Sequence, residues 1–192
     1  MAIKQPIKGQ GKLKRPKPKK PKKKWTPFTS TNTSGQQYGT SQLERDFARD
    51  FLDKNGIRYI YQYEAKDIKR FFDFAVTCDR KTNYITEEKD GITCIKQDGQ
   101  YVDIDLIIEI DGSYYHADPR VVGDKKLNSM QKHSKFVDAL KDRWCMARCV
   151  TILRFWEYDI RHHPKKVLEE LSKYINISNE KRRILENKKR PH

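Results

Sequence analysis

The sequence predicts an α/β fold in which a mixed central sheet is flanked by helices, with the elements in the order αβββαβα. Two observations support this prediction. Short segments rich in β-forming residues alternate with longer segments that have helical spacing of apolar residues. The last of these strands follows a long helix, and a strand that returns through a helix usually lies parallel to its neighbour in the sheet. The chain is long enough to bury the core of one such domain.

The folded domain is expected to begin at Ser41. The segment Ser41-Gln-Leu-Glu44 has the pattern of a capping box, and an apolar stripe follows it before the turn signal Asn55-Gly56. The stripe consists of Leu43, Phe47, Phe51 and Leu52. Capping alone would explain Glu44, and a role in a functional site is the alternative.

Three strands are expected next, at Ile57–Tyr63, Phe71–Thr77 and Tyr101–Asp111. Residues 78–100 are polar and hold two Asp-Gly turn signals, which favours an elaborated hairpin with a short strand at Ile92–Ile95. Asp73 lies inside an otherwise apolar strand. Because a buried carboxylate needs a compensating partner, Asp73 is a candidate site residue.

The third strand ends in a run that combines apolar and acidic residues. Successive side chains of a strand point to opposite faces, so Glu109 and Asp111 are expected to share one face and Ile108 and Ile110 the other. Asp103 and Asp105 have the same parity, but only the later pair adjoins the loop that carries Tyr114, Tyr115 and His116. The alternative for the later pair is a solvated strand end.

A loop at 117–129 and a helix from about Met130 to Arg148 follow the third strand. Helical spacing predicts that Phe136, Ala139, Leu140 and Trp144 form the packed face of this helix, and Asp138 and Asp142 stand one turn apart. A strand at 150–156 and a helix that opens at Pro164 complete the domain. The last helix carries an apolar stripe of Val167, Leu168, Leu171 and Ile175.

The net charge of +15 belongs to the two ends of the chain. Residues 1–24 hold eleven Lys or Arg and no acidic residue, residues 181–192 hold six against one Glu, and residues 25–180 hold 24 basic and 25 acidic residues. We therefore expect a disordered Lys/Pro-rich arm and linker at 1–40, a domain at 41–176 and a basic tail at 177–192. Such a polycation favours nucleic acid, by counterion release, over a membrane surface. The residues expected to contact phosphates are Lys14, Arg15, Lys17, Lys19, Lys20, Lys22, Lys23 and Lys24.

The four cysteines do not form a recognisable framework. Cys78, Cys94, Cys145 and Cys149 lack the two-residue spacing of common zinc sites, so buried free thiols are preferred to a structural zinc site. The sequence contains neither an apolar run long enough to cross a membrane nor the apolar segment of a signal peptide. We expect a cytoplasmic protein, in the host cell if the gene belongs to a phage.

Four segments together resemble the very-short-patch repair endonucleases within the PD-(D/E)xK nuclease superfamily. They are Phe-Asp-Phe-Ala-Val at 72–76, Ile-Glu-Ile-Asp-Gly-x-Tyr-Tyr-His at 108–116, an Asp in the following helix, and Ile-Leu-Arg-Phe-Trp-Glu at 152–157. The chain is more similar to the related phage homing endonucleases named for their E-D-x-H-D residues. The resemblance covers about residues 41–160 and implies a restriction-endonuclease-like core and cleavage of double-stranded DNA.

The resemblance also implies roles for individual residues. Glu44 matches the family's first-helix Glu, Asp73 its metal-binding Asp, His116 its catalytic His, and Asp142 its late-helix Asp, with Asp138 as the alternative. The family's position for a further histidine holds Asp111, no Lys follows Glu109 at the expected spacing, and Ser113 stands where the repair enzymes have a zinc-binding Cys. These departures argue against a repair enzyme in the strict sense.

A mechanism follows as a hypothesis. Asp73 with Glu109 or Asp111 would bind Mg²⁺, for which Mn²⁺ could substitute, because these hard cations prefer carboxylate oxygens. His116 would act as general base or acid, Asp142 would orient His116 or a water, and Glu44 would bind a second metal ion or a water beside it. Two alternatives remain: a non-enzymatic nucleic-acid-binding or packaging protein, and a repair or recombination nuclease that uses the same site. The sequence leaves the target site, the oligomeric state, and the choice between a nick and a double-strand break open.

Overall fold

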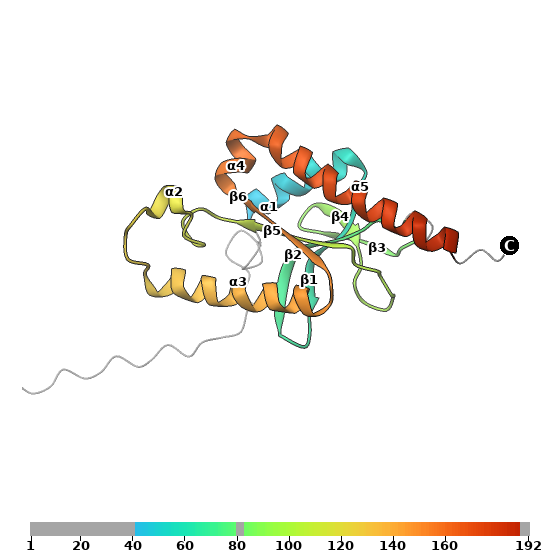
Figure 1. The fold of residues 1–192 in the computed structure, drawn as a ribbon, viewed down its shortest axis with the longest axis horizontal. Coiled ribbons are helices and arrows are strands. Elements are labelled where there is room, and N and C mark those ends of the chain that lie inside the picture. Colours follow the sequence, from blue (N-terminus) through green and yellow to red (C-terminus); the bar gives the residue numbers. More distant parts are fainter. Residues whose placement is uncertain (1–40, 80–82, 189–192) are drawn as a thin grey trace, which may run out of the picture.

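A computed structural model describes residues 41–79 and 83–188 (Figure 1). Its centre is a four-stranded mixed sheet with strand order β1-β2-β5-β6. β1, β2 and β5 are antiparallel neighbours, and β6 lies parallel to β5. The elements are α1 (Gln42–Phe47), the π-helical turn η1 (Ala48–Leu52), the 3₁₀ turn η2 (Asp53–Asn55), β1 (Arg58–Ala65), β2 (Arg70–Thr77), β3 (Thr86–Lys89), β4 (Ile92–Ile95), β5 (Leu106–Asp111), α2 (Pro119–Val122), α3 (Ser129–Ala147), β6 (Thr151–Trp156), α4 (Glu157–His162) and α5 (Pro164–Lys188).

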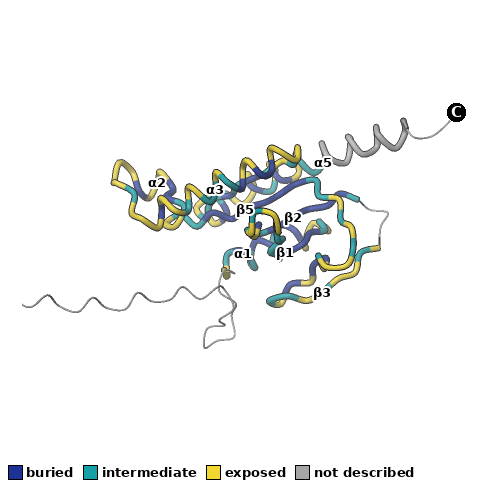
Figure 2. Tube along the Cα trace, turned by 90° about the horizontal axis from the view of Figure 1, so that it is seen from below, coloured by how far each residue is buried: buried dark blue, intermediate teal, exposed yellow. Residues whose placement is uncertain are grey.

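Helices cover both faces of the sheet, which confirms the predicted α/β class with a mixed sheet (Figure 1). One apolar cluster joins Phe47 of α1 and Leu171 of α5 to Ile108 of β5. A second cluster, on the opposite face, joins Trp144 of α3 to Ile107 of β5. The strands of the central sheet lie between these two sets of helices in Figure 1, and Figure 2 shows that they are largely buried.

The first helical segment forms as its sequence predicts. The Ser41 hydroxyl accepts the Glu44 amide and the Glu44 carboxylate accepts the Ser41 amide, which completes the capping box. The segment ends at Gly56, whose positive φ of 63° is the left-handed conformation that glycine adopts at low cost. The middle of the segment, η1, is wound as a π-helix, a feature that the spacing of apolar residues did not reveal.

Two strand predictions need correction. The third core strand begins at Leu106, not at Tyr101, so Asp103 precedes it. The predicted hairpin at 78–100 does form, as the pair β3 and β4 with a turn at Asp90-Gly91, but it makes a separate two-stranded sheet that packs beside β1. Both turn residues have positive φ, as a tight hairpin turn requires.

The face of α3 that packs on the sheet differs from the predicted one. Phe136 is 60% exposed and Ala139 is also exposed, whereas Lys141 and Trp144 are buried. The prediction assumed that apolar residues mark the inner face of a helix. Here a lysine lies on that face because carboxylates of β5 neutralise it, as described below.

The remaining boundaries agree closely with the predicted ones. α3 begins at Ser129 with a capping box formed by Asn128 and Gln131, and the expected loop before it contains the short helix α2. α5 opens at Pro164 and continues to Lys188, beyond the domain boundary expected at residue 176. Within the described residues, no helix has the length and apolar character that crossing a membrane requires. The basic arm and the linker lie outside the described residues.

Candidate active site

The candidate site begins where β2 and β5 separate. The ladder between these strands ends at the pair Phe74 and Ile108, so Asp73 and Glu109 are the first residues beyond it. Their carboxylates replace the missing ladder bonds. The amide of Ile110 donates to Asp73 Oδ2 at 2.7 Å, and the amide of Asp73 donates to Glu109 Oε1 at 3.2 Å. The backbone of β5 therefore holds the Asp73 carboxylate, and the backbone of β2 holds the Glu109 carboxylate.

A second irregularity lies on the other side of Asp73, in β1. Gln62 has a positive φ of 52°, which is unusual for a residue other than glycine. Tyr61 packs in the cluster beneath α1 and α5, and Tyr63 packs in the cluster beneath α3, so the regular alternation of β1 breaks at Gln62. Backbone strain of this kind is concentrated at functional sites. Here it lets Gln62 Nε2 donate to Glu44 Oε2 at 2.8 Å.

Glu44 is buried and fully engaged. One carboxylate oxygen accepts the Ser41 amide at 3.1 Å, and the other accepts from Gln62 and from the Tyr61 hydroxyl at 3.2 Å. Burial raises the pKa of Glu44 above its ordinary value despite these donors. The capping role is thus confirmed. Glu44 also lies close enough to Asp73 for its charge to raise the pKa of Asp73.

Asp73 and Glu109 form an electrostatically strained pair. Burial, followed by the charge of Glu44, raises the pKa of Asp73 to about 7. Burial, followed by the charge of Asp73, raises the pKa of Glu109 to about 8. Two neighbouring carboxylates, one buried and one half-buried, resist simultaneous ionisation, and a cation between them would relieve the repulsion.

Lys141 supplies one such cation, from α3. Its Nζ lies 2.6 Å from Glu109 Oε2, and the residue is only 9% exposed. Burial alone would lower the pKa of Lys141, but Glu109 and Asp73 together raise it above its ordinary value. Arg154 Nη1 lies farther away, 3.8 Å from Glu109 Oε2, and the pKa values of both carboxylates remain raised despite these cations. A hard divalent cation, which prefers carboxylate oxygens, would fit the pair.

His116 lies in a neighbouring cluster at the end of β5. Its Nδ1 is 3.0 Å from Asp138 Oδ2 and 3.4 Å from Asp111 Oδ1. Burial lowers the pKa of His116, but Asp138 and Asp111 outweigh burial and raise it overall. Asp111, His116 and Asp138 each offer one ligand atom, and these atoms lie within 4.8 Å of one another. The two facing ligands of a Mg²⁺ ion stand about 4.2 Å apart, so this cluster also has roughly the spacing of a metal site.

The predicted common face of Glu109 and Asp111 is confirmed. Both point toward α3, and Ile108 and Ile110 belong to the cluster on the other side. The expectation that Asp142 orients His116 is wrong. Asp138 takes that position, and Asp142, one turn later, accepts from Arg154 Nη2 at 2.9 Å with 52% of its side chain exposed.

Sequence reasoning missed two residues of the site and ranked a third as the alternative. Lys141 and Arg154 were not considered as site residues, and Asp138 stood second to Asp142. Asp138, Lys141 and Cys145 are spaced to share one helical face, but two of the three are charged, so a search for apolar periodicity does not identify that face as the inner one. Arg154 does carry a signal in β6, since it alternates with buried Leu153 and Phe155.

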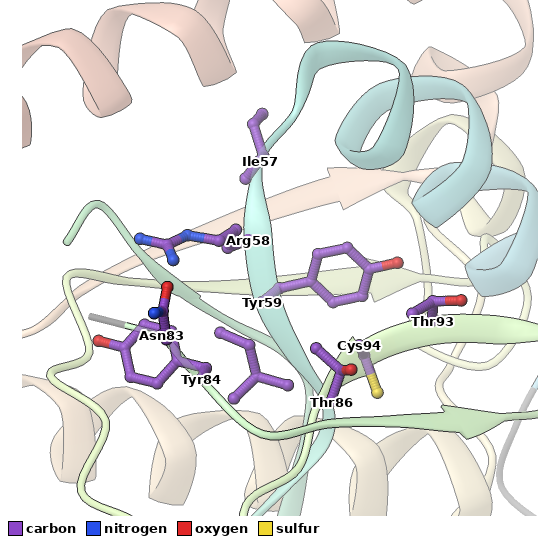
Figure 3. Close-up of a pocket in the computed structure, with 9 residues that line it drawn as sticks. Ile57, Arg58, Tyr59, Asn83, Tyr84, Thr86, Thr93 and Cys94 are labelled. Carbon is purple, nitrogen blue, oxygen red and sulfur yellow. The ribbon is translucent and has the colours of Figure 1, made fainter. Parts of the chain in front are cut away.

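Two other features do not join this site. Cys94 and Cys145 lie in different apolar clusters, and Cys78, Cys94 and Cys145 are buried free thiols as expected, whereas Cys149 is exposed. A pocket of about 270 Å³ lies between β1 and the hairpin, lined by residues that include Arg58, Tyr59 and Tyr84 (Figure 3). Its lining includes the first residues of β1 and none of the carboxylates of the candidate site.

Comparison of the chain with models of protein families, with curated proteins and with solved structures finds no significant match.

Proposed function

We propose that this protein is a metal-dependent endodeoxyribonuclease whose active site comprises Asp73, Glu109, Lys141 and His116. The observation that carries the proposal is the pair of carboxylates at the separated ends of β2 and β5, Glu109 buried and Asp73 half-buried, with a buried lysine against Glu109. Gathering two acids and an amine away from solvent is costly for folding. Such an arrangement is expected where the strained charges serve chemistry on a phosphodiester.

Asp73 and Glu109 would hold the divalent cation, Mg²⁺ with Mn²⁺ as a substitute, and this ion would supply positive charge against the phosphate oxygens. Lys141 lowers the pKa of Glu109 against the larger effect of burial and so favours the ionised form, which is the oxygen ligand. Glu44 stays hydrogen-bonded on both oxygens and adds negative potential at Asp73. Asp73 and Glu109 would thus bind the ion, and Glu44 would raise the pKa of Asp73.

His116 is the proposed proton-transfer group. With its Nδ1–H donated to Asp138, the neutral ring keeps the lone pair of Nε2 free to accept a proton from the attacking water. Asp138 fixes this orientation and stabilises the charged ring that results, and 24% of the His116 side chain remains exposed to solvent. In the alternative role of general acid, the protonated imidazole would give its proton to the leaving 3′ oxygen.

The proposed substrate is double-stranded DNA. The basic residues of the arm would contact phosphates, which gives affinity and a fast encounter but no sequence readout. Our assignment of the sheet and helices to a restriction-endonuclease-like core, and of the biology to phage-type homing, derives from the sequence resemblance. Repair and recombination remain the biological alternatives, because the same site would serve them.

The decisive experiment is cleavage of supercoiled plasmid DNA with and without Mg²⁺. Asp73→Ala should abolish Mg²⁺-dependent cleavage and retain DNA binding in a gel-shift assay. Asp50→Asn is the matched control, because Asp50 forms exposed ion pairs with Arg49 and Lys54 away from the site. Unchanged cleavage by purified Asp73→Ala would contradict the proposal. Binding without any divalent-dependent cleavage in the parent protein would favour the non-enzymatic packaging alternative.

A further inference from the structure

Arg154 of β6 lies among the carboxylates of the His116 cluster. Its Nη1 is 3.3 Å from Asp111 Oδ1 and 3.5 Å from Asp138 Oδ1. The same nitrogen is 3.8 Å from Glu109 Oε2, the oxygen that Lys141 also contacts. One guanidinium nitrogen thus stands within 4 Å of three carboxylates on two different elements.

The rest of the guanidinium is anchored along α3. Nη2 donates to Asp142 Oδ1 at 2.9 Å and lies 3.4 Å from the Asp138 carbonyl oxygen, and Nε lies 3.3 Å from Asp142 Oδ1. Arginine remains charged at every physiological pH and its planar fork fits several oxygens at once. The position of this cation is therefore set by the fold and does not depend on a titration.

Arg154 and a metal ion would compete for the same oxygens. Asp111 Oδ1 faces both His116 Nδ1, at 3.4 Å, and Arg154 Nη1, at 3.3 Å. Asp138 faces His116 with one oxygen and Arg154 with the other. A divalent ion bound by Asp111, His116 and Asp138 would lie next to the guanidinium and would be repelled by its charge.

We propose that the guanidinium of Arg154 takes the place of a second metal ion. Its positive charge keeps Asp111, His116 and Asp138 from coordinating such an ion. If Asp73 and Glu109 bind a divalent ion, as the proposed function requires, that ion would be the single one in the site. This part of the inference rests on the proposed function. Arg154 also leaves the His116 ring paired with Asp138, which is the arrangement that proton transfer requires. Coordination of a metal by His116 would remove that role.

The test is a count of bound Mn²⁺ ions by electron paramagnetic resonance of the free ion, on the full-length protein. We expect Arg154→Gln to bind one Mn²⁺ more than the parent protein. The double variant Arg154→Gln, His116→Ala should lose that additional ion. With Co²⁺ as the probe, the visible absorption that appears in Arg154→Gln should likewise disappear in the double variant.

Two controls separate this effect from misfolding and from general charge loss. Arg154→Lys keeps a positive charge at the same place and should bind as many ions as the parent protein. Arg148→Gln removes an arginine whose ion pair with Asp67 lies at the C-terminal end of α3, away from the site, and it should also leave the count unchanged. Thermal unfolding of each variant identifies any that is not folded. If Arg154→Gln is not folded, Arg154→Met provides a second neutral substitution.

The outcomes distinguish this inference from the proposed function. An unchanged count in folded Arg154→Gln and Arg154→Met would overturn it, as would a parent protein whose Mn²⁺ binding falls on His116→Ala. A parent protein that binds no Mn²⁺, together with an Arg154→Gln variant that gains one ion at His116, would support the role of Arg154 and contradict metal binding at Asp73 and Glu109.

Discussion

Lys141 Nζ lies 2.6 Å from Glu109 Oε2, where α3 crosses the end of β5. Breaking such a pair by removing one partner leaves the other charge buried and alone, which typically costs about 3–5 kcal/mol. The pair therefore links the stability of the domain to the charge state of the proposed metal site.

Lys141→Met should destabilise the domain by roughly 3 kcal/mol, because it leaves Glu109 without its cation. Adding Glu109→Gln to this variant should restore part of the loss, since the buried charge is then gone as well. A double-mutant cycle measured by urea unfolding gives the coupling energy of the pair. Independent, additive effects of the two substitutions would show that the contact does not contribute to stability.

Asp73→Asn should stabilise the metal-free protein at alkaline pH, by roughly 1–2 kcal/mol. The folded-state pKa of Asp73 is raised to about 7, so the folded state binds a proton more tightly than the unfolded chain does. The associated stability is present at low pH and is lost as the pH rises through about 7. The asparagine can still accept the Ile110 amide and carries no charge.

The control for this prediction is the pH dependence itself. The difference in melting temperature between Asp73→Asn and the parent protein should be larger at pH 8.5 than at pH 5, where Asp73 is already protonated. A difference that does not change with pH would mean that repulsion among the carboxylates is not its cause.

Mg²⁺ should raise the melting temperature of the parent protein, because it binds the folded state and neutralises the Asp73–Glu109 pair. At a concentration one hundred times the dissociation constant, the gain is about 2.7 kcal/mol. Removal of the ion with EDTA should reverse the shift. Asp73→Asn should respond far less to Mg²⁺ than the parent protein does, and an equal response would place the ion elsewhere.

Asp138→Asn should lower the cleavage rate more than Asp142→Asn, by about 10²-fold against a few-fold, because Asp138 contacts His116 whereas Asp142 pairs with Arg154. Loss of the Asp138 charge should also lower the pKa of His116, which Asp138 and Asp111 hold above its ordinary value. If His116 is the general base, the acid limb of the rate profile then moves to lower pH. Single-turnover cleavage across pH measures both effects, and Asp142→Asn is the matched control.

Deletion of residues 1–24 should reduce the salt dependence of DNA binding. These residues carry eleven of the positive charges, and each phosphate contact contributes about 0.9 to the slope of log K against log salt. If half of them contact phosphates, the magnitude of this slope should decrease by about 5 on deletion. An unaltered slope would show that the arm does not lie on the DNA.

Local sequence patterns were sufficient for much of the fold. The capping box at Ser41, the turn at Asp90-Gly91 and the strand that carries Glu109 and Asp111 on one face all follow from interactions between residues a few positions apart. Such interactions can be recognised in a sequence, because helices and strands have fixed periodicities. The α/β class and the candidates Asp73, Glu109 and His116 follow from the same patterns.

The pairing of charges was decided only by the tertiary structure. Whether Asp138 or Asp142 meets His116, and whether Lys141 or Arg154 neutralises Glu109 and Asp111, depends on how far α3 is rotated about its axis where it crosses β5 and β6. Apolar periodicity could not give that rotation, because the inner face of α3 carries Asp138 and Lys141. Buried charges are tolerated there since each meets its counter-charge from a distant part of the chain, and no local pattern records such a meeting.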